Sequence, residues 1–249
     1  MKFIKLSSAV VLGTLLVGGA ITTAEAASDK YPSGDKANQS AKVILDIDGS
    51  TVNPVNPEDP DVPIDPVDPE NPGTNDNDAM LKIGYVSDLN FGGTSEKPIK
   101  YEGKELVLNA AKDTNFKDET GNLELNPFIN IEDRRVDGDG EDDGKVGIYT
   151  ITASMDTTGF SNGTTSIKGA EINLGTTKVN TYGDTATVTD LTIGAGDTSK
   201  EVIKATKAIG SQSVSFQPAT LTIPKNASFS KGAYNATIVW NITGLTPDA

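Results

Sequence analysis

Apolar and polar residues alternate over several short segments of the chain, and no long stretch keeps the 3.6-residue period of a helix. Gly, Asn and Asp separate these segments, in which Thr and Val are frequent. The pattern predicts an all-β domain, either an antiparallel β-sandwich or a barrel-like sheet, with Gly/Asn/Asp-rich loops. Strands are expected at residues 81–86, 105–108, 128–132, 146–155, 171–174, 185–193, 201–206, 213–223 and 234–243, and short helical turns near residues 201–208.

Two segments alternate most regularly. The even positions of residues 234–243 are Tyr234, Ala236, Ile238, Trp240 and Ile242, and the odd positions of residues 149–155 are Tyr149, Ile151, Ala153 and Met155. A period of two places each set on one face of a strand, so we expect both faces to be buried. For Trp240 this favours packing in the core over contact with a ligand, whereas both roles stay open for Tyr149.

The N-terminal region has the layout of a secretory signal peptide. Lys2 and Lys5 precede a short apolar run, and an Ala-Glu-Ala cleavage pattern ends at Ala26. The apolar run is short and Gly-rich for a membrane span. We therefore expect residues 1–26 to be removed, residues 27–40 to form a disordered tail, residues 41–249 to carry the β domain, and the mature chain to have no membrane span.

A proline repeat follows a short predicted strand at residues 42–48. Seven prolines recur at every third residue, at Pro54, Pro57, Pro60, Pro63, Pro66, Pro69 and Pro72. Such spacing predicts a polyproline II spacer over residues 53–78, whose prolines share one edge and whose repeat spans about 60 Å. Two arrangements stay open for residues 42–48: pairing with the sheet of the same domain, which would make the spacer a surface strap, or with an edge strand of another protein.

Charge and composition exclude several functions. Removing residues 1–26 takes two lysines and one glutamate from 21 basic and 35 acidic residues, which leaves a net charge of −15. Phosphate contacts need the opposite sign, so no binding to nucleic acid is expected. The chain has no His and no Cys, which excludes Ser-His and Cys-His nucleophile pairs and the usual zinc ligands. No LPxTG-like sorting signal is present, so any attachment to a wall is expected to be non-covalent.

An acidic loop is the one candidate metal site. It contains five carboxylates, at Asp137, Asp139, Glu141, Asp142 and Asp143. Gly-spaced oxygen ligands suit Ca²⁺, but the spacing does not match an EF-hand loop. A solvated hairpin loop is therefore favoured over a Ca²⁺ site, and no cofactor is expected. A glycan hydrolase also stays open as a minor alternative, although it needs an acid in an apolar cleft rather than in Gly-rich loops.

Several motifs resemble the WxL surface proteins of Gram-positive bacteria. Trp240, Asn241 and Ile242 resemble the distal Trp-x-Leu motif, and residues 149–151 lie where the first such motif is expected. Residues 127–135 resemble the family's PFVxVxDxR lead-in, and residues 88–92 and 219–224 match as well. Tyr149 stands in place of Trp, and Ile151 and Ile242 in place of Leu.

The resemblance implies non-covalent attachment to peptidoglycan or another wall glycan, and complexes with other surface proteins or membrane-anchored partners. It makes Tyr149, Ile151, Trp240 and Ile242 the candidate motif or ligand-binding residues. We therefore expect a secreted, non-catalytic cell-surface protein. The alternatives are an assembly subunit of a surface complex without glycan affinity and a wall glycan hydrolase.

Overall fold

The computed structural model describes residues 43, 53–135, 144–180 and 185–245 of the 249-residue chain. The predicted signal peptide, the predicted tail and the expected strand at residues 42–48 lie outside the described residues, except Val43. The strands are β1 (Asp65–Pro66), β2 (Leu81–Val86), β3 (Leu106–Asn109), β4 (Phe116–Asp118), β5 (Gly121–Asn122), β6 (Phe128–Asp133), β7 (Tyr149–Met155), β8 (Glu171–Asn180), β9 (Ala186–Val188), β10 (Leu191–Gly194), β11 (Lys200–Ala205), β12 (Gly210–Ile223) and β13 (Ile238–Gly244).

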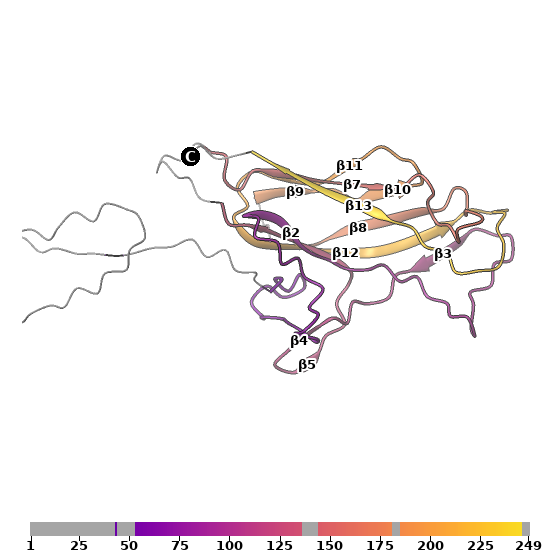
Figure 1. Ribbon diagram of the computed structural model, residues 1–249, viewed down its shortest axis with the longest axis horizontal. Helices are drawn as coiled ribbons and strands as arrows, with labels where there is room; N and C mark the ends of the chain where they lie inside the picture. The colour runs from indigo at the N-terminus through magenta and orange to yellow at the C-terminus, as the bar shows by residue number, and fades with distance from the viewer. Residues whose placement is uncertain (1–42, 44–52, 136–143, 181–184, 246–249) are drawn as a thin grey trace, which may run out of the picture. The chain divides into compact units, whose positions relative to one another are not determined.

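Two antiparallel sheets form the body of the domain (Figure 1). The larger sheet has the strand order β10-β8-β12-β6-β2, and the smaller one has the order β13-β7-β11-β9. The long strand β12 pairs with β6 through its first half and with β3 through its last residues, while β8 runs along its other side. The predicted all-β antiparallel fold is confirmed.

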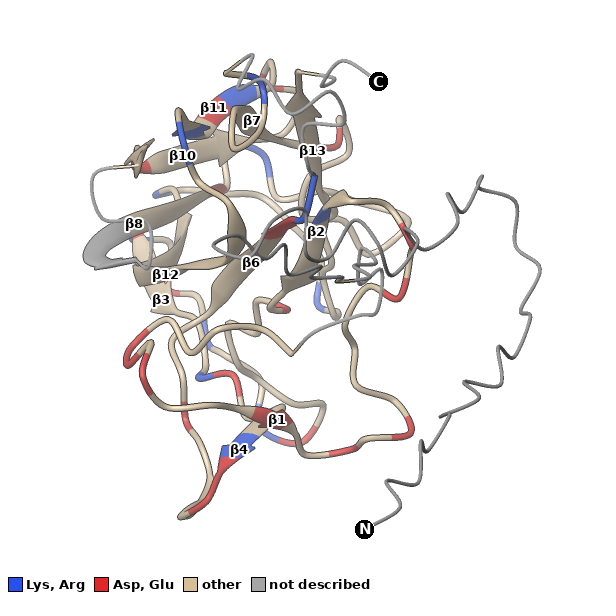
Figure 2. Ribbon diagram, turned by 90° about the vertical axis from the view of Figure 1, so that its left-hand side faces the viewer, with Lys and Arg blue, Asp and Glu red and all other residues tan. Residues whose placement is uncertain are grey.

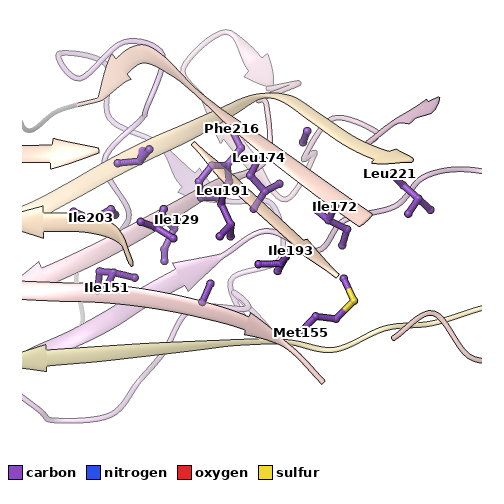
Figure 3. Close-up of a cluster of buried hydrophobic side chains, with 14 of the residues drawn as sticks. Ile129, Ile151, Met155, Ile172, Leu174, Leu191, Ile193, Ile203, Phe216 and Leu221 are labelled. Carbon is purple, nitrogen blue, oxygen red and sulfur yellow. The ribbon is translucent and has the colours of Figure 1, made fainter. Parts of the chain in front are cut away.

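The main core fills the space between these two sheets, as Figure 3 shows. Strand β7 alternates between buried and half-buried residues along its whole length, because every second side chain turns toward the other sheet. Ile129, Ile151, Ile193 and Ile203, which come from four different strands, are all fully buried. Their non-directional apolar burial is the principal stabilising contribution to the sandwich.

A second, smaller core lies beside a three-stranded sheet, β1-β4-β5. Tyr85 packs there against Phe116 and Phe128, with ring centroids 4.9 Å apart in both pairs. The Tyr85 hydroxyl donates to Asp113 Oδ2 at 2.6 Å. Burial is the main cause that raises the pKa of the Tyr85 hydroxyl far above its ordinary value, and the hydrogen bond to Asp113 adds to it.

The proline repeat is not a continuous extended rod, which corrects the polyproline II prediction. Val55 and Pro63 form an antiparallel bridge, and the Val62 N–H donates to the Asp59 carbonyl at 3.0 Å, so the chain turns back within the repeat. Strand β1, also within the repeat, pairs with β4. We call residues 53–78 the strap, because this segment lies along the domain and displays acidic residues there (Figure 2).

Most predicted strands appear with shifted ends. Strand β2 has the predicted bounds, and the expected strand at residues 185–193 is divided into β9 and β10. The predicted helical turns near residues 201–208 are wrong for most of their length, because β11 pairs there with both β7 and β9. Neighbouring strands on both sides override the weak local helical pattern.

Candidate functional site

The two resembled motifs lie side by side on paired strands. Strands β13 and β7 are antiparallel neighbours in the smaller sheet, and their register places Ile242 opposite Ile151 and Trp240 opposite Ala153. Tyr149 lies opposite Gly244, so the aromatic residue has a partner without a side chain. Segments about ninety residues apart in the sequence therefore form one surface that faces the interior of the sandwich.

Tyr149 and Ile151 belong to the core. Their side chains are 1% and 0% exposed, and they pack among the residues between the two sheets. A ligand outside the domain therefore has almost no access to either side chain. Their position fits a role in packing rather than in recognition.

Trp240 and Ile242 are placed differently, because both stay half-buried. The indole of Trp240 stacks on the ring of Phe216, which belongs to β12 in the opposite sheet, at 5.7 Å and 21° between the ring planes. Phe216 itself is 2% exposed. The predicted alternation along residues 234–243 is therefore present, but its inner face is only half covered.

The PFVxVxDxR-like lead-in contains a buried ion pair that ties three parts of the chain together. Arg135 donates from Nε to Asp133 Oδ1 at 2.8 Å and from Nη2 to Asp133 Oδ2 at 2.5 Å. Arg135 also donates to the carbonyls of Ile148, which precedes β7, and Leu245, which follows β13. Asp133 is 0% exposed and accepts a further bond from the Gly147 N–H at 3.1 Å.

This arrangement gives the Asp and Arg of the lead-in a structural role. Two nearly parallel N–H···O bonds are the strongest geometry available to an Arg–carboxylate pair. Because the same guanidinium reaches the residue before β7 and the residue after β13, it joins the two motif strands at the end where β7 begins and β13 ends. We name this ion pair with its backbone partners the Asp133–Arg135 clamp.

A second buried carboxylate lies on the opposite face of β6. Glu132 is 1% exposed and faces Lys82 Nζ at 3.6 Å and Arg134 Nη2 at 3.3 Å. A β-carbon at Gly84 would lie only 2.7 Å from Glu132 Oε1, so the glycine leaves the room that this carboxylate occupies. Burial raises the pKa of Glu132 above its ordinary value, although the positive charges of Lys82 and Arg134 oppose the shift.

The shift of Glu132 predicts how stability depends on pH. A carboxyl whose pKa is raised in the folded state stabilises the fold below its unfolded pKa of about 4.3, and this contribution is lost as the pH rises through the folded value. We therefore expect the unfolding free energy of the wild type, minus that of Glu132→Gln, to fall between pH 4 and pH 7. Urea unfolding of both proteins at each pH measures this difference. A difference that rises with pH would mean that the two ion pairs outweigh burial.

An aromatic cluster with polar neighbours includes residues of the loop that precedes β13. Phe229 contacts Tyr101 and Tyr234, with centroid distances of 5.2 and 5.8 Å, and all three rings are half-buried. The Tyr234 hydroxyl donates to the Ser230 carbonyl and accepts from Asn162 Nδ2 at 3.2 Å. Asn162 Nδ2 also donates to Ser230 Oγ. We name these rings, with Asn162, Thr165 and Ser230, the aromatic platform.

The aromatic platform is held in place by backbone contacts. The Tyr101 hydroxyl donates to the Pro224 carbonyl at 2.6 Å and accepts from the Ala227 N–H at 2.8 Å, so it fixes the loop that carries Phe229. Thr165 Oγ1 lies 2.8 Å from the Tyr234 hydroxyl. Sequence reasoning did not identify this cluster, because its members come from three separate loops and only Tyr234 stood in a recognised pattern.

The remaining candidate site was the acidic loop. Asp137, Asp139, Glu141, Asp142 and Asp143 lie outside the described residues, so Ca²⁺ binding there stays a prediction. Within the part of the chain that the structure describes, no three carboxylates gather in an arrangement that could hold a metal ion. The same part of the chain contains no helix with the length and apolar character needed to cross a membrane.

Comparison with known families identifies the relationship of the chain. A family model described as "WxL domain surface cell wall-binding" matches residues 33–245. The chain belongs to this WxL family. Searches of curated proteins and of solved structures gave no match. The match covers the strap, both sheets and the Asp133–Arg135 clamp, so the WxL domain here comprises the body described between residues 53 and 245. Membership of this family supports a cell-surface protein that binds the wall.

Proposed function

We propose that this WxL protein is secreted, has no catalytic activity of its own, and attaches non-covalently to the wall by binding peptidoglycan through the aromatic platform. Membership of a cell wall-binding family supports the wall as the target. The observation that carries the proposal is the aromatic platform itself. It combines half-buried ring surfaces with amide and hydroxyl groups, and its members carry no charge.

Sugar rings have apolar C–H faces and hydroxyl edges. Aromatic side chains can pack against the apolar C–H faces, and the amide and hydroxyl groups can donate to and accept from the sugar hydroxyls. Glycan strands of a wall are long and repetitive, so a shallow platform suits them better than a closed pocket. The motif residues Tyr149 and Ile151 do not compete for this role, because they are buried in the core.

The buried carboxylates also favour binding over hydrolysis. The described carboxylates that are buried are Asp113, Glu132 and Asp133. Asp113 accepts from Tyr85 and Ser87, Glu132 faces two cationic groups, and Asp133 is held by Arg135. A glycosidase needs two carboxyl groups that flank the scissile bond in one cleft. Each of these three is instead engaged with neighbours of its own.

Sedimentation with purified peptidoglycan tests the proposal. The wild type is expected to pellet with the polymer, and Phe229→Ala is expected to weaken binding about 2- to 10-fold, since an aromatic contact contributes about 0.5–1.5 kcal/mol beyond its buried area. Ile209→Ala, which truncates a 52% exposed apolar residue outside the platform, is the control and should bind like the wild type. Unfolding curves of each variant show whether the fold is kept.

Three results would count against the proposal. If the wild type pellets no more than an unrelated acidic protein, the alternative of an assembly subunit without glycan affinity gains. If Phe229→Ala binds as well as the wild type, the platform is not the contact surface. Release of reducing sugars from the polymer would contradict the absence of catalysis.

A further inference from the structure

Strand β13 is a sheet edge with unpaired backbone groups. The Thr237 carbonyl accepts from the Asp156 N–H at 3.1 Å and the Leu245 N–H donates to the Ile148 carbonyl at 3.4 Å, so the odd-numbered residues direct their backbone groups toward the β7 side. Backbone groups alternate in direction along an antiparallel strand, so the even-numbered residues of β13 direct their N–H and C=O groups to the side away from β7. Among the described residues, β13 pairs with β7 alone, which leaves the outward N–H and C=O groups of Ile238, Trp240 and Ile242 open.

The sheet edges at β2, β9 and β10 are protected in the ways expected of soluble proteins. The strap covers β2, because the Asn75 N–H donates to the Gly84 carbonyl at 2.7 Å, and β2 also carries the buried Lys82. Strands β9 and β10 are only three and four residues long, and Lys200 Nζ donates to a carbonyl of β10. Short length, charge and coverage all discourage pairing with another chain.

Strand β13 has none of these protections. It is seven residues long, and residues 232–247 contain no charged residue in a chain with a net charge of −14. Val239, on its outer face, is 43% exposed. A long, uncharged and apolar edge is the feature that predicts association through strand pairing.

The sequence of β13 is also symmetric about Trp240. On the inward face the residues on either side of Trp240 are Ile238 and Ile242, and the next two are the small residues Ala236 and Gly244. If β13 paired antiparallel with a second copy of itself about a two-fold axis at Trp240, each isoleucine would lie opposite an isoleucine and each small residue opposite a small residue. Such isologous pairing is the commonest route to a homodimer.

We propose that two copies of this chain pair through their β13 strands, antiparallel and in register about Trp240. The pairing joins the two four-stranded sheets into one of eight strands. Ile238 then lies opposite Ile242 of the second copy, and the outward backbone groups exchange two hydrogen bonds at each such pair. The half-buried inner faces of the two strands become continuous, which removes Ile238, Trp240 and Ile242 from water.

The two copies carry like net charge, so association should strengthen with ionic strength. Repulsion between the two acidic bodies is screened by salt, whereas the uncharged contact itself is little affected. One strand pair is a small interface, which corresponds to a weak dimer rather than a permanent one. The dimer is thus expected only at high protein concentration, such as that on a crowded surface.

Sedimentation equilibrium over a range of protein and salt concentrations tests the dimer. Trp240 is the one tryptophan of the chain, so its fluorescence should shift to shorter wavelength as the dimer forms. In the proposed register Val239 faces Asn241 of the second copy across a close, non-hydrogen-bonded pair. The double variant Val239→Lys with Asn241→Lys should therefore stay monomeric, because lysines then face each other across the interface. The double variant Val239→Lys with Asn241→Glu should dimerise, because each lysine then faces a glutamate of the second copy.

The control is a matched pair on another strand. Val107 and Asn109 are exposed and two residues apart on β3, so Val107→Lys with Asn109→Lys adds the same charges to a strand outside the interface and should dimerise like the wild type. Equal unfolding midpoints in dilute solution show that all variants are folded. The proposal is wrong if the wild type stays monomeric at every concentration and salt, or if the Lys/Lys variant of β13 dimerises as well as its Lys/Glu counterpart.

Discussion

Replacing Arg135 with alanine is expected to lower the free energy of unfolding by about 3–5 kcal/mol, because it leaves Asp133 as a buried carboxylate without its ion-pair partner. The substitution also removes the donor that reaches the carbonyls of Ile148 and Leu245, so both motif strands lose an anchor. Urea-induced unfolding followed by circular dichroism measures the change.

Lys200→Ala provides the matched control for this prediction. Lys200 and Asp197 also form an ion pair, at 2.9 Å, but their side chains are 44% and 41% exposed. An exposed pair contributes about 0–1 kcal/mol, so the control should unfold almost like the wild type. The double variant Asp133→Asn with Arg135→Met should recover part of the lost stability, since no unpaired charge then stays buried. Equal losses for Arg135→Ala and Lys200→Ala would contradict the role of the clamp.

Replacing Tyr149 with alanine is expected to cost about 3–5 kcal/mol of stability, the range typical for truncating a large aromatic side chain in a core. Tyr149 is 1% exposed and packs between the two sheets, so the surrounding residues can close only part of the space that it leaves. Tyr149→Phe keeps the ring and should lose much less. Thermal and urea unfolding of both variants give the two values.

Measuring both the stability of Tyr149→Ala and its binding to peptidoglycan distinguishes a core role of Tyr149 from contact with the ligand. Val107→Ala, at a 54% exposed position, should change stability by under about 0.5 kcal/mol and serves as the control. If Tyr149→Ala unfolds like the wild type but no longer pellets with peptidoglycan, Tyr149 contacts the ligand and its assignment to the core is wrong. Loss of both properties together is the result expected for a core residue.

Several strands of the two main sheets could be predicted from the sequence because one face of each is buried. In β7 and in the last five residues of β12, the burial of alternate side chains leaves a period of two in the sequence itself. Strands β1, β4 and β5 could not be predicted in this way, because two or three residues are too short for a period to appear. Strand β1 is further concealed by a proline repeat whose regular spacing indicated polyproline II.

The long-range contacts were harder to predict than the strands. The motif residues were recognised, but no spacing rule shows that Ile151 and Ile242 are direct partners. The bonds of Arg135 to the carbonyls of residues 148 and 245 could not be predicted, because they depend on the tertiary fold. The half burial of Trp240 depends on where the sheet ends, which alternation within one strand does not reveal.

The strap is shorter in space than its number of residues allows. Its proline repeat, if fully extended, would act as a spacer of about 60 Å. Because the chain instead turns back between Val55 and Pro63, and Ser213 Oγ donates to the Val55 carbonyl at 2.7 Å, part of that length is lost. The strap therefore serves as part of the surface of the domain rather than as a stalk, and wall polymers that approach this side meet a fixed, acidic border.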